Sequence, residues 1–121
     1  MKYKAITVYG IPNCDTVKKA RTWLTDHGFE YVFHDFKKQG LPEIHLDAWL
    51  QSAGWEVVVN RKGTSWRKLS PSEQASVVSG ASARPYLLVN PSLIKRPVIE
   101  WLSDKGTEIT VGYQPDQWLV R

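Results

Sequence analysis

The chain has only one cysteine, Cys14, in its 121 residues. A single cysteine cannot form an internal disulfide or a cysteine-rich zinc site, so the fold must depend on its hydrophobic core. Long apolar runs are also absent, since the longest are residues 57–59 and 86–89, whereas a membrane-spanning helix needs about 18 apolar residues. The apolar stretch at residues 5–9 is too short for a signal peptide. We therefore expect a cytoplasmic protein without a membrane segment.

Acidic residues are scarce in one part of the chain. Residues 1–60 carry seven basic and seven acidic side chains, whereas residues 61–96 carry seven basic residues and one acidic residue, Glu73, for a local net charge of +6. This excess fits either a solvated basic surface or an anion site. Direct nucleic-acid binding is not expected, because the basic residues form three separate clusters without a recognition helix or zinc module.

The first third of the sequence has the pattern of a βαβ unit. Residues 4–9 are rich in β-branched and aromatic side chains, which predicts a strand that ends in the loop at residues 10–13. Val17, Ala20 and Leu24 recur at helical spacing, so residues 15–27 are predicted to form a helix capped by Gly28. Residues 29–34 then predict a second, parallel strand.

The rest of the chain predicts helices followed by a hairpin. We expect a helix over residues 43–52 that ends at Gly54, and a second helix with Ser70 as N-cap and Glu73 closing a capping box. Further helical turns are expected within residues 83–95. Residues 97–101 and 107–111 predict strands joined by a turn at residues 104–106, before a short helix over residues 114–119. The fold class is therefore α/β.

Cys14 follows the first predicted strand and lies at the start of the predicted helix. Unpaired backbone N–H groups and the positive end of the helix dipole favour an anion at such a position, and a thiolate is the anion that a cysteine can provide. We expect the hydroxyl of Thr16 to donate a hydrogen bond to the sulfur. The competing interpretation is a small, buried packing residue, but a loop at a strand end more often presents a side chain than buries it. We therefore predict that Cys14 is a nucleophile.

Several motifs, taken in order, resemble one protein family. They are Tyr-Gly-Ile-Pro-Asn-Cys-Asp-Thr at residues 9–16, the basic helix that follows, Arg61, Leu-Ile-Lys-Arg-Pro-Val-Ile at residues 93–99, and Val-Gly-Tyr at residues 111–113. This set is similar to the ArsC/Spx family, and most similar to its YffB-type branch. The resemblance implies one domain over residues 1–121, in which residues 1–38 and 82–121 form a thioredoxin-like core with a mixed four-stranded sheet. Residues 39–81 would be a helical insertion.

The resemblance also implies roles for individual residues. Cys14 matches the family's catalytic cysteine, and Arg96 and Arg61 match its arginine partners. Pro97 matches a cis-proline that opens the third strand. The substrate-binding residues implied are Asn13, Thr16 and Pro97.

Two departures from the family pattern bear on function. The Cys-x-x-Cys pair of Spx-type proteins would need a cysteine at position 17, which is Val17. The family's arsenate reductases use a further arginine after the last strand, but residues 112–114 read Gly-Tyr-Gln, which weakens the arsenate interpretation. Without a second cysteine, a mixed disulfide on Cys14 must be released by an external thiol such as glutathione or a glutaredoxin.

These observations favour a glutathione-dependent thiol reductase, with glutathione as co-substrate and a small anionic or disulfide substrate. The alternatives are an Spx-like regulator that binds RNA polymerase, and an arsenate reductase. No metal is expected, because the three histidines, His27, His34 and His45, lack metal-ligand spacing with carboxylates or with Cys14.

Overall fold

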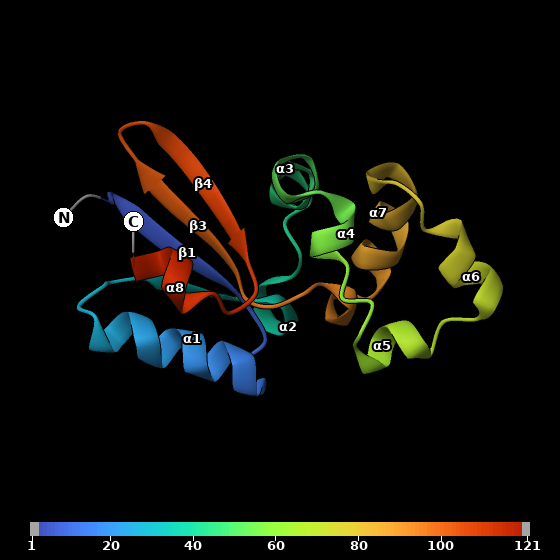
Figure 1. Cartoon of the computed structure of the whole chain (residues 1–121), viewed down its shortest axis with the longest axis horizontal. Coiled ribbons are helices and arrows are strands. Elements are labelled where there is room, and N and C mark those ends of the chain that lie inside the picture. The colour runs from blue at the N-terminus through green and yellow to red at the C-terminus, as the bar shows by residue number, and fades with distance from the viewer. Residues whose placement is uncertain (1–2, 120–121) are drawn as a thin grey trace. The chain divides into compact units, whose positions relative to one another are not determined.

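A four-stranded sheet organises the part of the chain that carries Cys14 in this computed structural model, which describes residues 3–119 (Figure 1). The strands are β1 (Ala5–Gly10), β2 (Val32–Asp35), β3 (Val98–Ser103) and β4 (Gly106–Val111), in the order β2-β1-β3-β4. β1 pairs with β2 in parallel and with β3 antiparallel, and β3 pairs antiparallel with β4. The predicted mixed sheet and α/β class are confirmed, and strand and helix order is that of a thioredoxin-like fold.

The chain divides into two compact units. The first contains the described residues up to Gly40 and those from Arg96 onward, and the second is Leu41–Lys95. The first unit holds the sheet with α1 (Asp15–Asp26), α2 (Phe36–Gln39) and α8 (Pro115–Leu119). The second unit is helical and contains α3 (Glu43–Ala53), α4 (Trp55–Val58), α5 (Thr64–Arg67), α6 (Pro71–Ser76), α7 (Gly80–Val89) and the 3-10 turn η1 (Pro91–Leu93).

The core of the first unit lies between one face of the sheet and two helices. Side chains alternate along a strand, so every second residue of β1 and β3 faces α1 and α8. This core consists of Tyr3, Ile6, Val8, Ala20, Leu24, Ile99, Trp101 and Trp118. In Figure 1, α1 and α8 lie on the same side of the sheet. The predicted apolar stripe of α1 is confirmed, because Val17, Ala20 and Leu24 are all buried.

The second unit is built from short helices. α3 packs against α4 and α7, and η1 packs against α5 and α7. Ser70 caps α6 with the predicted capping box, in which its hydroxyl accepts from the Glu73 N–H and the Glu73 carboxylate accepts from the Ser70 N–H. The largest fully buried side chains of this unit include Leu46, Trp49, Leu87, Leu93 and Ile94.

Several boundaries differ from the prediction. β2 begins at Val32 rather than residue 29, because Phe29 and Tyr31 pack against the core from the segment that precedes the strand. α7 begins at Gly80, where Ser79 forms a second capping box that the sequence reading did not identify. Residues 82–95, predicted to belong to the core, lie in the second unit.

Within residues 3–119, no helix combines the length and the apolar character needed to cross a membrane.

Candidate functional site

Cys14 is the N-cap residue of α1, and its side chain is half-buried. Its backbone is extended, its carbonyl accepts the first helical bond from the Lys18 N–H at 2.9 Å, and its side chain forms no capping hydrogen bond. Cys14 therefore begins the first turn of α1, whose leading N–H groups have no partner within the helix and where the helix dipole favours negative charge.

The loop that carries Cys14 depends on a close approach between β1 and α1. A β-carbon added at Gly10, the last residue of β1, would lie 2.9 Å from Cγ2 of Val17. Val17 is fully buried, so this contact has little room to relax. Glycine at position 10 thus lets the first turn of α1 pack directly against the end of β1. Position 17, where an Spx-type protein would carry its second cysteine, is here part of that packing.

The strand register brings a second segment to the same end of the sheet. Tyr9 pairs with Val98 in the antiparallel β1–β3 ladder, so the residues that follow Tyr9 lie beside those that precede Val98. Those residues are Arg96 and Pro97, and the peptide bond between them is cis, as the family resemblance implied. The Pro97 carbonyl accepts a hydrogen bond from the Gly112 N–H at 2.8 Å, so the residue after β4 also lies at this end of the sheet.

The predicted site residues of the first unit differ in exposure. Asn13 and Thr16 are exposed, whereas Pro97 is buried and Arg96 is half-buried, with its Nε atom covered. Asn13, Cys14 and Thr16 come from the loop and the first turn of α1, and Arg96 and Pro97 come from the segment before β3. This end of the sheet therefore brings together two sequence motifs, residues 9–16 and residues 93–99.

Arg61 belongs to the second unit, where its contacts are local. Its guanidinium lies 3.9 Å from a Glu56 carboxylate oxygen and 5.3 Å from the centre of the Trp55 ring. The side chain is exposed. Its role in the site stays a prediction from the family resemblance.

No group of three or more histidine, cysteine or acidic side chains within residues 3–119 could hold a metal ion. His27 bonds through Nδ1 to the Trp23 carbonyl oxygen at 2.8 Å and stacks on the Trp23 ring, and His34 bonds through Nε2 to the Gly40 carbonyl oxygen at 2.8 Å. Each of these two histidine rings therefore has one nitrogen atom in a hydrogen bond to a backbone carbonyl.

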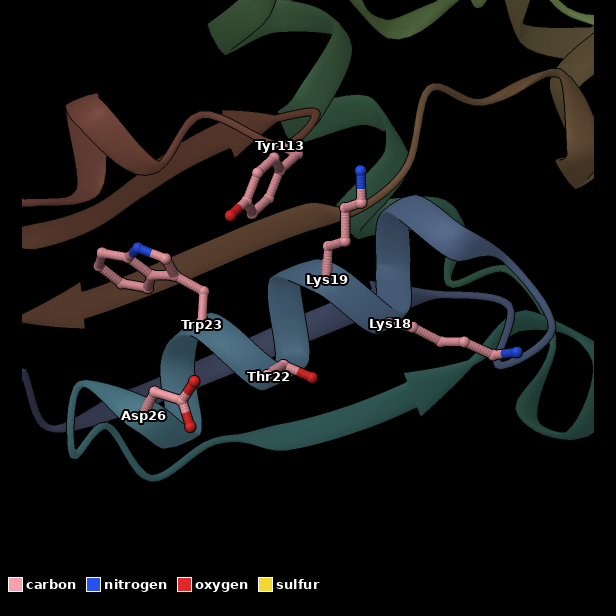
Figure 2. A pocket seen from close by; sticks show the side chains of 6 residues that line it. All are labelled: Lys18, Lys19, Thr22, Trp23, Asp26 and Tyr113. Carbon is pink, nitrogen blue, oxygen red and sulfur yellow. The ribbon is translucent and has the colours of Figure 1, made fainter.

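A groove of about 550 Å³ runs along α1, and its lining residues are Lys18, Lys19, Thr22, Trp23, Asp26 and Tyr113 (Figure 2). The sequence reading did not identify it. The spacing of four from Cys14 through Lys18 and Thr22 to Asp26 was a usable signal, because such residues neighbour one another along a helix. Tyr113 lies about ninety positions away in the chain, and no local pattern connects it to α1.

Fold and site together define a thioredoxin-like α/β protein with one cysteine at the start of the first helix. The model of the ArsC family matches residues 9–120 of the chain. The chain belongs to the ArsC family.

Three known proteins illustrate the range of this similarity. An uncharacterised protein of Haemophilus influenzae is 47% identical over 94 residues, which cover 78% of this chain and 82% of that protein. The solved structure of a YffB protein superposes with a TM-score of 0.86 at 42% identity and covers 96% of this chain and 97% of that one. The global transcriptional regulator Spx of Bacillus subtilis is 26% identical over 93% of this chain and 82% of its own length. The family thus includes a transcriptional regulator.

Proposed function

We propose that this protein is a glutathione-dependent thiol reductase in which Cys14 is the nucleophile. The observation that carries the proposal is the β1–β3 register, which places the Cys14 loop and the Arg96–Pro97 peptide at one end of adjacent central strands. A nucleophile beside a helix N-terminus and a nearby arginine are the groups that a thiol–disulfide exchange with an anionic thiol needs.

The proposed reaction has two exchange steps. The Cys14 thiolate attacks the glutathionyl sulfur of a mixed disulfide R–S–S–G. A Cys14–S–S–G bond forms as the substrate S–S bond breaks, and the thiolate RS⁻ leaves and takes up a proton from solvent. A second glutathione, as its thiolate, then attacks the sulfur of the bound glutathionyl group. This step releases the Cys14 thiolate and forms glutathione disulfide.

Arg96 and Arg61 are proposed to bind the glutathione carboxylates, with Asn13, Thr16 and Pro97 in contact with the substrate. A glutaredoxin is the other external thiol that completes the same cycle, since it also attacks Cys14–S–S–G. The absence of a cysteine at position 17 supports an external rather than an internal resolving thiol.

The test is the glutathione-dependent reduction of a glutathionylated peptide and of arsenate by the wild type and three variants. We expect turnover of the mixed disulfide that Cys14→Ser abolishes, and a rise of about tenfold in the KM for glutathione in Arg96→Ala, because a charge-assisted bond is lost. Arg67→Ala removes an exposed arginine of the same basic stretch and serves as the matched control. A wild type that reduces arsenate but no disulfide would replace this proposal with an arsenate reductase.

The reactivity of the thiol provides a separate prediction. The first turn of α1 and Arg96 are proposed to favour a negative charge on the Cys14 sulfur. We therefore expect iodoacetamide to alkylate the native protein at pH 6 several times faster than it alkylates the urea-unfolded chain. Mass spectrometry follows the modification of this one cysteine. Equal rates in the two states would mean that the fold does not activate the thiol, and the mechanism would be abandoned.

The second candidate function is regulation through contact with RNA polymerase. The observation that favours it is the similarity to Spx over 93% of the chain. Binding to purified RNA polymerase, compared between the wild type and Cys14→Ser, separates the two functions. Polymerase binding without any glutathione-coupled turnover would support regulation.

A further inference from the structure

The groove along α1 begins one helical turn beyond Cys14 and extends away from it. Of its lining residues, Lys18 and Lys19 are the nearest to Cys14 along α1 and Asp26 is the farthest. Figure 2 shows the Tyr113 ring between Lys19 and Trp23. In Figure 2, Lys19 and Trp23 project from α1 on the side where Tyr113 lies, and the Lys18 side chain points toward the N-terminal end of the helix. Cys14 is not among the lining residues, so the groove is separate from the sulfur atom itself.

The aromatic part of the groove is held rigidly. Trp23 stacks on His27 at 3.9 Å between ring centres and meets the Trp118 ring edge-on at 5.3 Å. Tyr113 also meets Trp118 edge-on, at 5.4 Å. Trp118 is fully buried in the core, so both rings are fixed to the same buried side chain. Rigid aromatic surfaces bind apolar side chains at a low entropic cost.

The charged ends of the groove are available to a ligand. Neither Lys18 nor Lys19 forms a salt bridge with any residue from 3 to 119, and the same holds for Asp26. The groove therefore presents two cations near the nucleophile, two aromatic rings in the middle, and one anion at the far end. A ligand with complementary charges would be acidic close to the reacting sulfur and basic farther from it.

We propose that this groove binds an extended peptide segment of a disulfide-bearing protein substrate, with an acidic residue, an aromatic residue and a basic residue in that order from the reacting cysteine. This inference rests on the proposed function and names its substrate class. Lys18 lies about 6 Å along the helix from Cys14, Trp23 about 13 Å and Asp26 about 18 Å, at 1.5 Å per residue. An extended peptide advances about 3.4 Å per residue. Along the helix axis, the three positions therefore correspond to about two, four and five to six peptide residues from the cysteine.

Side chains of an extended peptide alternate between its two faces, so residues at even offsets face the same way. The sequence Cys-Gly-Glu-Gly-Phe-Gly-Lys places all three contacts on one face. The charge-exchanged peptide Cys-Gly-Lys-Gly-Phe-Gly-Glu has the same composition and the opposite order of charges. Each peptide is also made in the reverse chain direction, because the groove residues do not fix the direction of the bound chain.

The first experiment measures binding without chemistry. The Cys14→Ser variant is titrated with each peptide carrying serine in place of cysteine, and amide shifts of Thr22, Asp26 and Tyr113 are followed by NMR. We expect the peptide with the acid near its first position, in one chain direction, to bind about tenfold more tightly than its charge-exchanged partner. Lys18→Glu with Lys19→Glu should reverse this preference. Lys37→Glu with Lys38→Glu changes two exposed neighbouring lysines of α2 outside the groove, and should preserve it.

The second experiment separates this proposal from the proposed function. Glutathionylated forms of the two peptides are offered to the full-length wild type, and kcat/KM for each is divided by kcat/KM for a small mixed disulfide of glutathione. We expect the ratio to be about tenfold higher for the peptide with the acid near its cysteine. Turnover of all substrates with no difference between the peptides would overturn the peptide groove and leave the reductase function intact. Charge-selective binding to Cys14→Ser without any turnover by the wild type would support the groove and overturn the reductase.

Discussion

The phenol of Tyr9 donates a hydrogen bond of 3.0 Å to Oε1 of Glu100, across the pair of central strands that carries the candidate site. Tyr9 is the residue before Gly10 and pairs with Val98 in the β1–β3 ladder. Glu100 lies two residues beyond Val98 on β3. Burial, together with the nearby Glu100 carboxylate and its hydrogen bond, raises the pKa of Tyr9 far above the ordinary value of 10.0. This hydrogen bond links β1 to β3 at the residue before Gly10, where the loop to Cys14 begins.

The first prediction is a loss of stability at high pH. Above about pH 10 the phenol ionises in the unfolded chain but keeps its proton in the folded protein, so the unfolded state binds fewer protons. The free energy of unfolding then falls as pH rises, by at most about 1.4 kcal/mol per pH unit from this group. Tyr9→Phe removes this contribution. Between pH 9 and pH 11, the free energy of unfolding in urea should fall more for the wild type than for Tyr9→Phe. An equal fall in the two proteins would contradict the prediction.

The second prediction concerns the contact between Gly10 and Val17. Gly10→Ala places a methyl group against the buried Val17 side chain and should lower the free energy of unfolding by about 1–3 kcal/mol, the usual cost of overpacking. Val17→Ala makes space for that methyl group. In a double-mutant cycle the second substitution should therefore cost less in the Gly10→Ala background than in the wild type. Additive effects would show that the close approach is not the cause.

The third prediction tests a hydrogen bond in the core. The indole N–H of Trp101 donates to Oγ1 of Thr110 at 2.9 Å, and both side chains are buried. Thr110→Val keeps the shape of the side chain but removes the acceptor, so we expect a loss of about 1–3 kcal/mol in urea unfolding. Thr110→Ser retains the hydroxyl and should lose less. A valine variant as stable as the serine variant would mean that the hydrogen bond contributes little.

The fourth prediction concerns an ion pair of the second unit. Arg84 in α7 donates to Asp47 in α3 through Nε at 2.6 Å and through Nη2 at 3.3 Å, and to Glu43 at 3.1 Å. The hydrogen bond to Arg84, with its charge, lowers the pKa of Asp47. Arg84→Met should raise that pKa in a carboxyl NMR titration, whereas Arg84→Lys should raise it less.

The same pair makes a pH-dependent contribution to stability. Because the pKa of Asp47 is lowered in the folded protein, this contribution is present above the ordinary aspartate pKa of 3.8 and is lost as pH falls through the lowered value. The difference in stability between the wild type and Arg84→Met should therefore be largest near neutral pH and shrink in acid. A difference that does not change with pH would exclude the ion pair as its source.

Local patterns were sufficient for the part of the site that is continuous in sequence. The strand, loop and helix around Cys14 were predicted correctly, because alternation, a glycine–proline loop and helical spacing act over few residues. The position of Arg96 and Pro97 beside that loop depends on strand register, which is set by pairing across about ninety residues. The family resemblance, and not the local pattern, provided that information.

The parts that the prediction missed depend on packing between distant residues. β2 was predicted too early because Phe29 and Tyr31 are aromatic residues of the core that precede the strand. The groove along α1 requires Tyr113, which reaches the helix only after β4 is paired. Aromatic character indicates burial, but it does not distinguish a strand residue from a segment that leads into one.

The strand order also determines when the sheet can be completed during synthesis. β1 ends at Gly10, but its antiparallel partner β3 begins at Val98. A ribosome therefore releases β1, α1 and β2, and then the whole of Leu41–Lys95, before the strand that covers the open edge of β1 exists. The N–H and C=O groups on that edge of β1 stay unpaired until β3 has been synthesised. Pairing of β1 with β3 is therefore a long-range step in folding. The loop that carries Cys14 thus reaches its final position only near the end of translation, when Arg96 and Pro97 have been added to the chain.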